Sequence, residues 1–282
     1  VTGELCAQTS VTGTISTNTV WTPAGSPYRI DGTVRIASSA RVDVEAGVKV
    51  EFEAAANLNI AGQFIALGSR EDSIYLAPAG NGSYTIETEP GCDLDWRFVE
   101  MRGSQGITQT AGALQMMNVA FSRSLFIDNE NALVFQPALP AQIDSCTFFG
   151  NTTALNFCWA NVDHSTFSQN ETGILSGNVN VARTTFGKHG ITAIRGGRGT
   201  IRECDFFYNP IAILEFGSSN TDSILNSTFA LNDTAFVATD PATIVRNNNI
   251  CNNDIAVRQT FSLGADFSGN SWCTNSTTQI DA

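Results

Sequence analysis

The sequence repeats a short motif in which an aromatic or aliphatic residue is followed three positions later by asparagine. The first residues of its eight copies are 19 to 23 positions apart, and they are Phe126, Phe148, Phe167, Phe186, Phe206, Phe229, Ile250 and Trp272. In the copy that begins at Phe186, His189 replaces the asparagine. A period of about 21 residues over half of the chain restricts the fold to an array of stacked repeats.

Each repeat contains two short segments rich in β-formers. One precedes the motif, as in residues 143–148, and the other follows the asparagine, as in residues 211–214. Such short segments suit strands between tight bends better than helices. The sequence therefore predicts an all-β parallel β-helix, a single-stranded solenoid in which coils of about 21 residues stack at about 4.8 Å.

The repeated motif has a structural explanation in this fold. The aromatic residue points into the coil and stacks on its counterparts, while the asparagine lies at a bend and bonds the amides above and below it. We therefore predict a structural asparagine ladder. Its members are Asn129, Asn151, Asn170, Asn209, Asn232, Asn253 and Asn275.

The N-terminal third differs in style but is compatible with the same fold. Residues 33–36, 41–52, 57–62 and 63–68 alternate apolar and polar side chains between short breaks, which is typical of strands with one buried face. No linker separates this part from the later repeats. We predict one β-helix domain over residues 31–282, with residues 1–30 as an N-terminal cap that covers the open end of the stack.

The alternating strands of residues 33–76, the segment 95–101 and the later Thr-Phe-x-x-Asn coils resemble the right-handed parallel β-helix proteins of the pectate-lyase-like superfamily. The closest similarity in style is to bacterial secreted and surface proteins of that group. The resemblance implies a right-handed solenoid and an extracellular or cell-surface location, with the periplasm as an alternative. The superfamily contains lyases, hydrolases, tailspikes and adhesins, so the resemblance leaves the activity open.

Cysteine spacing predicts one disulfide bond. Cys251 and Cys273 each follow the first residue of a motif, in adjacent coils. Registry between the coils places their Cα atoms about 5 Å apart, which is within disulfide range. The alternative is a pair of stacked buried thiols. Because the chain has seven cysteines, at least one thiol stays unpaired.

Charge and motifs exclude several function classes. A net charge of −12 disfavours nucleic-acid binding, and no apolar run reaches the roughly 18 residues that a membrane span needs. No phosphate loop, zinc motif or hydrolase elbow is present, and no metal or cofactor is expected. Polygalacturonase-like enzymes carry Asn-x-Asp, Asp-Asp and Gly-His-Gly motifs in successive coils, but this sequence has no Asp-Asp pair and only Lys188-His189-Gly190 in place of Gly-His-Gly. The stacked carboxylates of a calcium-dependent lyase are also missing, so no catalytic residue is assigned.

Five of the fifteen basic residues lie between positions 183 and 202, next to the histidine that interrupts the ladder. Such a cluster can attract a carboxylated or sulfated glycan through arginine side chains. The same residues could serve a lyase, with Lys188 or His189 as base, or could simply pair with Glu171, Glu203, Asp205 and Glu215. The glycan-binding candidates are Arg183, Lys188, His189, Arg195, Arg198 and Arg202.

The leading hypothesis is a non-catalytic secreted or cell-surface module that binds or adheres to a glycan or another cell-envelope component. Long exposed coil faces suit extended ligands of this kind. The alternative is a polysaccharide lyase or glycoside hydrolase that acts on an acidic polysaccharide. The sequence makes no prediction of oligomeric state.

Overall fold

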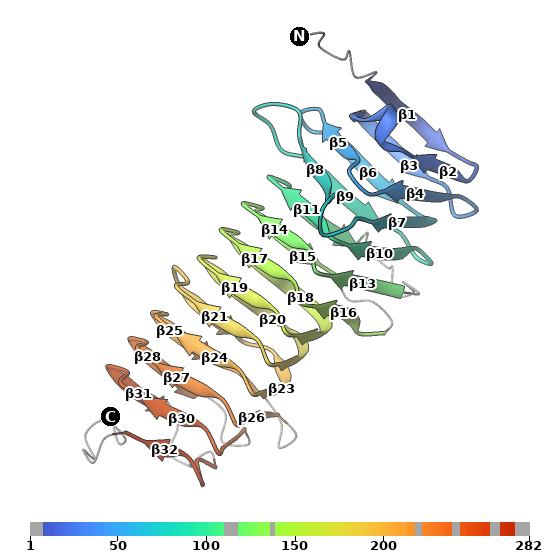
Figure 1. Ribbon diagram of the computed structural model, residues 1–282. Helices are drawn as coiled ribbons and strands as arrows, with labels where there is room; N and C mark the ends of the chain where they lie inside the picture. The colour runs from blue at the N-terminus through green and yellow to red at the C-terminus, as the bar shows by residue number, and fades with distance from the viewer. Residues whose placement is uncertain are drawn as a thin grey trace. The chain divides into compact units, whose positions relative to one another are not determined.

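The chain folds as a right-handed parallel β-solenoid, which confirms the predicted fold class. The computed structural model describes residues 8–109, 118–135, 139–217, 222–238, 243–259 and 266–273. These residues contain 32 strands and one short 3-10 helix, η1 (Pro23–Gly25), and the coils number about 11, with about 22 residues per turn. Contacts divide the chain into two units, Val1–Gln142 and Ile143–Ala282, and each is a stack of coils (Figure 1).

The first unit contains three parallel sheets. One consists of β2, β4, β7, β10 and β13, a second of β3, β5, β8, β11 and β14, and a third of β3, β6, β9, β12 and β15. The strands are β1 (Thr9–Ile15), β2 (Thr19–Trp21), β3 (Tyr28–Ile36), β4 (Arg41–Glu45), β5 (Lys49–Phe52), β6 (Asn57–Ile60), β7 (Gln63–Leu67), β8 (Ile74–Pro78), β9 (Thr85–Thr88), β10 (Asp93–Arg97), β11 (Val99–Arg102), β12 (Gly106–Gln109), β13 (Asn118–Ser122), β14 (Leu125–Ile127) and β15 (Asn131–Val134).

Alternation of buried and exposed side chains along these strands produces a narrow aromatic core. Trp21, Phe64, Trp96 and Phe121 follow one another in edge-to-face contacts, with ring centroids 5.4–5.9 Å apart. Of the segment predicted as a cap, residues 1–7 lie outside the described residues. The rest contains β1 and β2, which pair in parallel with β3 and β4.

The second unit also has three faces, which we name A, B and C. β16 (Ala141–Asp144) runs across the boundary between the units. The other strands are β17 (Thr147–Phe149), β18 (Thr153–Asp163), β19 (Thr166–Ser168), β20 (Thr172–Ala182), β21 (Thr185–Gly187), β22 (Thr192–Arg195), β23 (Arg198–Arg202), β24 (Asp205–Phe207), β25 (Ile211–Leu214), β26 (Ser223–Leu225), β27 (Thr228–Ala230), β28 (Thr234–Ala238), β29 (Ile244–Arg246), β30 (Asn249–Cys251), β31 (Ile255–Gln259) and β32 (Ser271–Trp272).

Face A consists of the second halves of β18 and β20 with β23, β26 and β29. Face B consists of β17, β19, β21, β24, β27, β30 and β32. Face C consists of the first halves of β18 and β20 with β22, β25, β28 and β31. Between faces A and B and between faces B and C the chain turns through single residues with left-handed backbone geometry, such as Arg183 and Lys188.

The repeated phenylalanines form the predicted column in the core of the second unit. The rings of Phe148, Phe167, Phe186, Phe206 and Phe229 stack nearly parallel, with centroids 4.5–4.9 Å apart and interplanar angles of 4–15°. This spacing equals the distance between parallel strands, so each coil contributes one ring to a continuous stack.

The asparagine ladder lies beside this column. Asn209 donates from its backbone N–H and from Nδ2 to Oδ1 of Asn232, which repeats the same two bonds to Asn253 at 2.9–3.0 Å. Asn151 and Asn170 form an equivalent pair, and in the first unit Asn129 donates to the backbone oxygen of Met101. The ladder satisfies amides that the bends leave without strand partners. The predicted member Asn275 lies outside the described residues.

Candidate functional site

The six predicted glycan-binding residues do not form one cluster. Arg198 and Arg202 begin and end β23 on face A, and Arg183 lies in the turn that leaves this face. Arg195 ends β22 on face C, and Lys188 lies in the turn after face B. His189 points into the core, where it is 4% exposed. The sequence cluster therefore separates into a group of arginines at face A and residues that lie elsewhere.

Face A has a shallow groove of about 330 Å³. Two rows of outward side chains border it, because the strands pair in register. One row contains Asn161, Asn180 and Thr200, and the other contains Asp163, Ala182 and Arg202. Ala182 lies between a carboxylate and a guanidinium, and its small side chain leaves the space that the groove occupies.

The amides along the groove are ordered by hydrogen bonds between coils. Asn180 donates from Nδ2 to Oδ1 of Asn161 at 3.1 Å, and its own Oδ1 accepts the backbone N–H of Thr200 at 3.2 Å. A third row, formed by Trp159, Asn178 and Arg198, lies next to them on the same strands. Face A therefore presents amide, hydroxyl, guanidinium and indole groups.

The charges at the edge of the groove are partly neutralised. Arg183 forms an ion pair with Asp163 and a longer one of 3.6 Å with Glu203, and the hydrogen bond that Arg183 donates to Asp163 raises the pKa of Arg183. Arg202 lies 3.9 Å from Glu203, and half of its side chain is exposed. Exposed pairs of this kind contribute little to stability, so Arg202 is available to a ligand.

Asp144, Asp163 and His164 offer three potential metal ligands within 4.8 Å of one another. The hydrogen bond that His164 receives at Nε2 from Arg183, at 3.0 Å, requires the proton of a neutral ring to be on Nδ1. Nδ1 is the nitrogen that faces the two carboxylates. With Arg183 also neutralising Asp163, the geometry forms an ion-pair network rather than a metal site.

His189 occupies the ladder position of its coil. Its ring Nδ1 lies 3.1 Å from Oδ1 of Asn209, and Nε2 has no hydrogen-bond partner. Burial lowers the pKa of His189 to about 4, so the ring is neutral near pH 7. A neutral imidazole inside the core cannot contact a polysaccharide, which removes His189 from the candidate bases and ligand-binding residues.

The imidazole of His189 is larger than the asparagine side chain of other coils. Glycine in place of alanine at position 173 of the neighbouring coil leaves space for it. The column of inward residues on face C contains Ala154, Ala193 and Ala212 but has Gly173 in the coil before His189. A Cβ atom on Gly173 would lie 2.6 Å from His189 Nε2. The two departures from the repeat thus compensate each other in volume.

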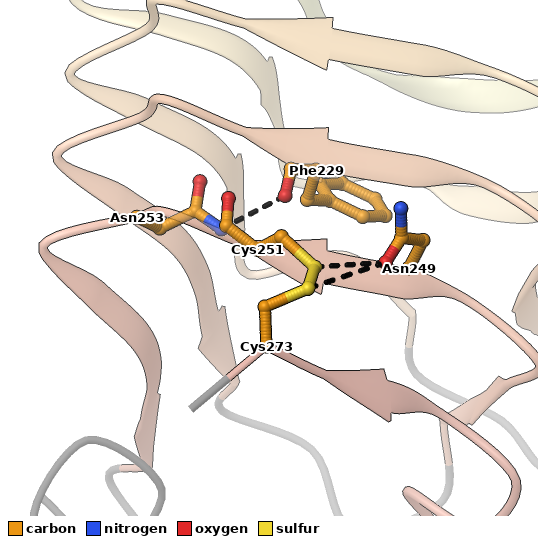
Figure 2. Close-up of a disulfide and its surroundings, with 5 residues drawn as sticks. All are labelled: Phe229, Asn249, Cys251, Asn253 and Cys273. Carbon is orange, nitrogen blue, oxygen red and sulfur yellow. Dashed lines mark hydrogen bonds between the residues drawn. A yellow bond between two sulfur atoms is a disulfide. The ribbon is translucent and has the colours of Figure 1, made fainter. Parts of the chain in front are cut away.

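The predicted disulfide bond is present. Cys251 and Cys273 are bonded with their Cα atoms 4.8 Å apart, as the registry of adjacent coils requires (Figure 2). Oδ1 of Asn249 lies 2.8 Å from Cys251 Sγ beside the bond. In contrast, Cys92 and Cys204 are buried thiols, and burial raises the pKa of each to about 12, which makes them poor nucleophiles.

Two features of the second unit were not predicted from the sequence. A second polar ladder lies where face A turns into face B, and in it Ser227 accepts a backbone N–H from Cys204 and donates its own to Asn248. The sequence contains this ladder as the column of residues two positions before the first residue of each motif. The groove itself was missed because Asn161, Asn180 and Thr200 belong to no linear motif and become a row only when the register is known.

The described residues contain no helix long and apolar enough to cross a membrane. Comparisons with protein-family models, with curated proteins and with solved structures found no match to this chain.

Proposed function

We propose that the protein is a secreted or cell-surface β-helix module of the pectate-lyase-like superfamily that binds a glycan of the cell envelope through face A. The groove of face A carries this proposal, since its rows of amide, hydroxyl and guanidinium groups match the hydroxyls and acid groups of a polysaccharide. The indole of Trp159 adds a flat apolar surface of the kind on which a sugar ring stacks.

Extended ligands suit this site because its rows continue from coil to coil. Asn161, Asn180 and Thr200 repeat at the strand spacing of about 4.8 Å in three successive coils. A chain of sugars that lies along the solenoid therefore meets a new polar group at each step. The disulfide bond supports an oxidising compartment such as the cell exterior.

The alternative of a lyase or hydrolase has weaker support. Lys188 lies away from the groove, His189 is buried, and Asp163 is held in an ion pair with Arg183. A paired carboxylate is a weak base, so the groove combines binding groups with little means of proton abstraction.

The test is retention of the protein in affinity gels that contain polygalacturonate, alginate, heparin or neutral dextran. We expect retardation by acidic polymers, weakened about fivefold by Arg202→Ala and by rising salt. Arg195→Ala removes the same type of side chain from face C and is the matched control, with parental retention expected. Retention by none of the polymers contradicts the proposal, and release of unsaturated products or reducing ends favours the enzymatic alternative.

A further inference from the structure

A second hollow, separate from the groove of face A, is an open depression of about 370 Å³ on face B of the same unit. It lies outside β19, β21 and β24 and has a largely apolar lining. Phe207 and Tyr208 form one side, Thr185 and Ser168 contribute hydroxyl groups, and Lys188 contributes an ammonium group. Its volume falls in the range of about 300 to 1,000 Å³ that is usual for small-molecule sites.

The hollow exists because two small outward residues, Ser168 and Gly187, lie between larger ones. The outward positions after the buried phenylalanines are Phe149, Ser168, Gly187 and Phe207 in four successive coils. Gly187 has ordinary backbone geometry, and a Cβ there would meet one atom, the Phe207 carbonyl oxygen, at 3.4 Å. The backbone therefore does not require glycine at this position, and its effect is to leave the hollow open.

The rim consists of residues from the turns that follow face B. Gln169, Lys188 and Tyr208 have φ values of 55–58°, a left-handed geometry that suits glycine or asparagine best. Two other coils follow this preference, with Gly150 and Asn252 at the equivalent turn, whereas a third coil has Leu231 there at a φ of 59°. A bulky tyrosine at positive φ adds backbone strain, yet its side chain is 56% exposed and contributes little to the core.

The charge of the hollow is that of one unpaired cation. None of the ion pairs among the described residues includes Lys188. Asp205 continues the row of Thr166 and Thr185 and does not line the hollow. Aromatic side chains beside a single ammonium group favour a flat apolar ring that carries one negative charge.

We propose that this hollow is a binding site for a small aromatic carboxylate. The ring packs over Gly187 and against Phe207 and Tyr208, the carboxylate pairs with the Lys188 ammonium, and the hydroxyls of Ser168 and Thr185 take a polar substituent on the ring. A sugar acid carries the same charge, but its hydroxyls on both faces suit the amide-rich groove of face A better than this apolar lining. The site is independent of the proposed glycan function.

The test is an NMR titration of the folded protein with 4-hydroxybenzoate, with saturation-transfer contacts to the ring. For about ten heavy atoms in an open site we expect a Kd of about 1 to 5 mM. The neutral methyl ester and cyclohexanecarboxylate, which lack the charge and the aromatic ring respectively, should each bind at least about threefold more weakly. If galacturonate binds as tightly as 4-hydroxybenzoate or more tightly, the ligand is a sugar acid and the proposal is wrong. If no ligand contact saturates during the titration, the hollow is not a binding site.

Variants that the fold accepts locate the binding. Gly187→Val fills the hollow on a strand that favours valine, and we expect it to abolish binding without loss of stability. Tyr208→Asn and Lys188→Asn place at the turn the residue that Asn252 already provides, and should weaken binding about fivefold and threefold. Leu231→Asn makes the same change one coil beyond the rim and should bind like the parent.

Asp205→Asn removes a negative charge near the hollow, and should therefore tighten binding of the carboxylate but not of its neutral ester. Arg202→Ala, which weakens the proposed glycan groove, should leave the titration with 4-hydroxybenzoate unchanged. The two proposals can therefore fail independently of each other. Binding that persists in Gly187→Val, or that falls equally in Leu231→Asn, contradicts the assignment to this hollow.

Discussion

His189 should make the protein less stable in mild acid, and His189→Asn should remove that sensitivity. Burial lowers the pKa of this imidazole from 6.5 to about 4. Between these values the unfolded chain binds a proton that the folded chain does not, so stability falls as the pH falls from about 6.5 to about 4. Above this window the ring is neutral in both states and has no effect.

The magnitude follows from the two pKa values. Linkage gives a loss of about 2 kcal/mol at pH 5 and about 3 kcal/mol at pH 4 relative to pH 7. The ring is 4% exposed, so solvent screens this loss very little. Asparagine at position 189 would offer its Oδ1 to the backbone N–H of Asn170. Oδ1 of Asn170 accepts the backbone N–H of Asn151 in the same way one coil earlier. We expect stability at pH 7 to change by no more than about 1 kcal/mol.

The assay is urea unfolding of the parent and the variant at pH 7, 5 and 4.5. Carboxylates titrate in both proteins, so the difference between their pH profiles isolates His189. An unchanged pH profile in His189→Asn, or a loss of several kcal/mol at pH 7, would refute the account of this position.

Three further changes test the structure. Cys273→Ser, or reduction of the disulfide, should lower the free energy of unfolding by about 3 kcal/mol, because the bond closes a loop of 22 residues; unchanged urea midpoints would contradict this. Asn232→Ala removes a buried side chain that donates to Asn253 and accepts two bonds from Asn209, and should cost about 3 kcal/mol in the same assay. Gly173→Ala should cost more than about 2 kcal/mol, because its Cβ would meet the Ala193 carbonyl oxygen at 2.5 Å and His189 Nε2 at 2.6 Å; His189→Asn should relieve the second contact, so strictly additive losses would contradict the pairing.

The fold could be predicted from the sequence because its period is local. A phenylalanine and an asparagine at a fixed separation specify one inward ring and one bend per coil, and the stack of Phe167 on Phe186 follows from the period alone. The disulfide was predictable for the same reason, because Cys251 and Cys273 share a position in adjacent repeats.

The candidate sites were less predictable because exposure depends on which side of a turn a residue occupies. Lys188 and His189 are neighbours in sequence, yet the left-handed turn at Lys188 directs one side chain to solvent and the other to the core. Basic residues that are close in sequence therefore lie at face A, at face C and in the turn after face B. The groove of face A depends on the register between β18, β20 and β23, which no single repeat specifies.

Departures from the repeat carry different information according to the side on which they lie. Inside the coil, His189 in place of asparagine is balanced by Gly173 in place of alanine, so packing explains both residues. Outside the coil, Gly187 and Tyr208 also depart from what the strand and turn favour, but no contact in the core compensates them. Packing accounts for the inward departures. Outward residues at positive φ also occur away from any hollow, as at Leu231, so the outward departure that the proposed ligand explains is Gly187, which leaves the hollow open.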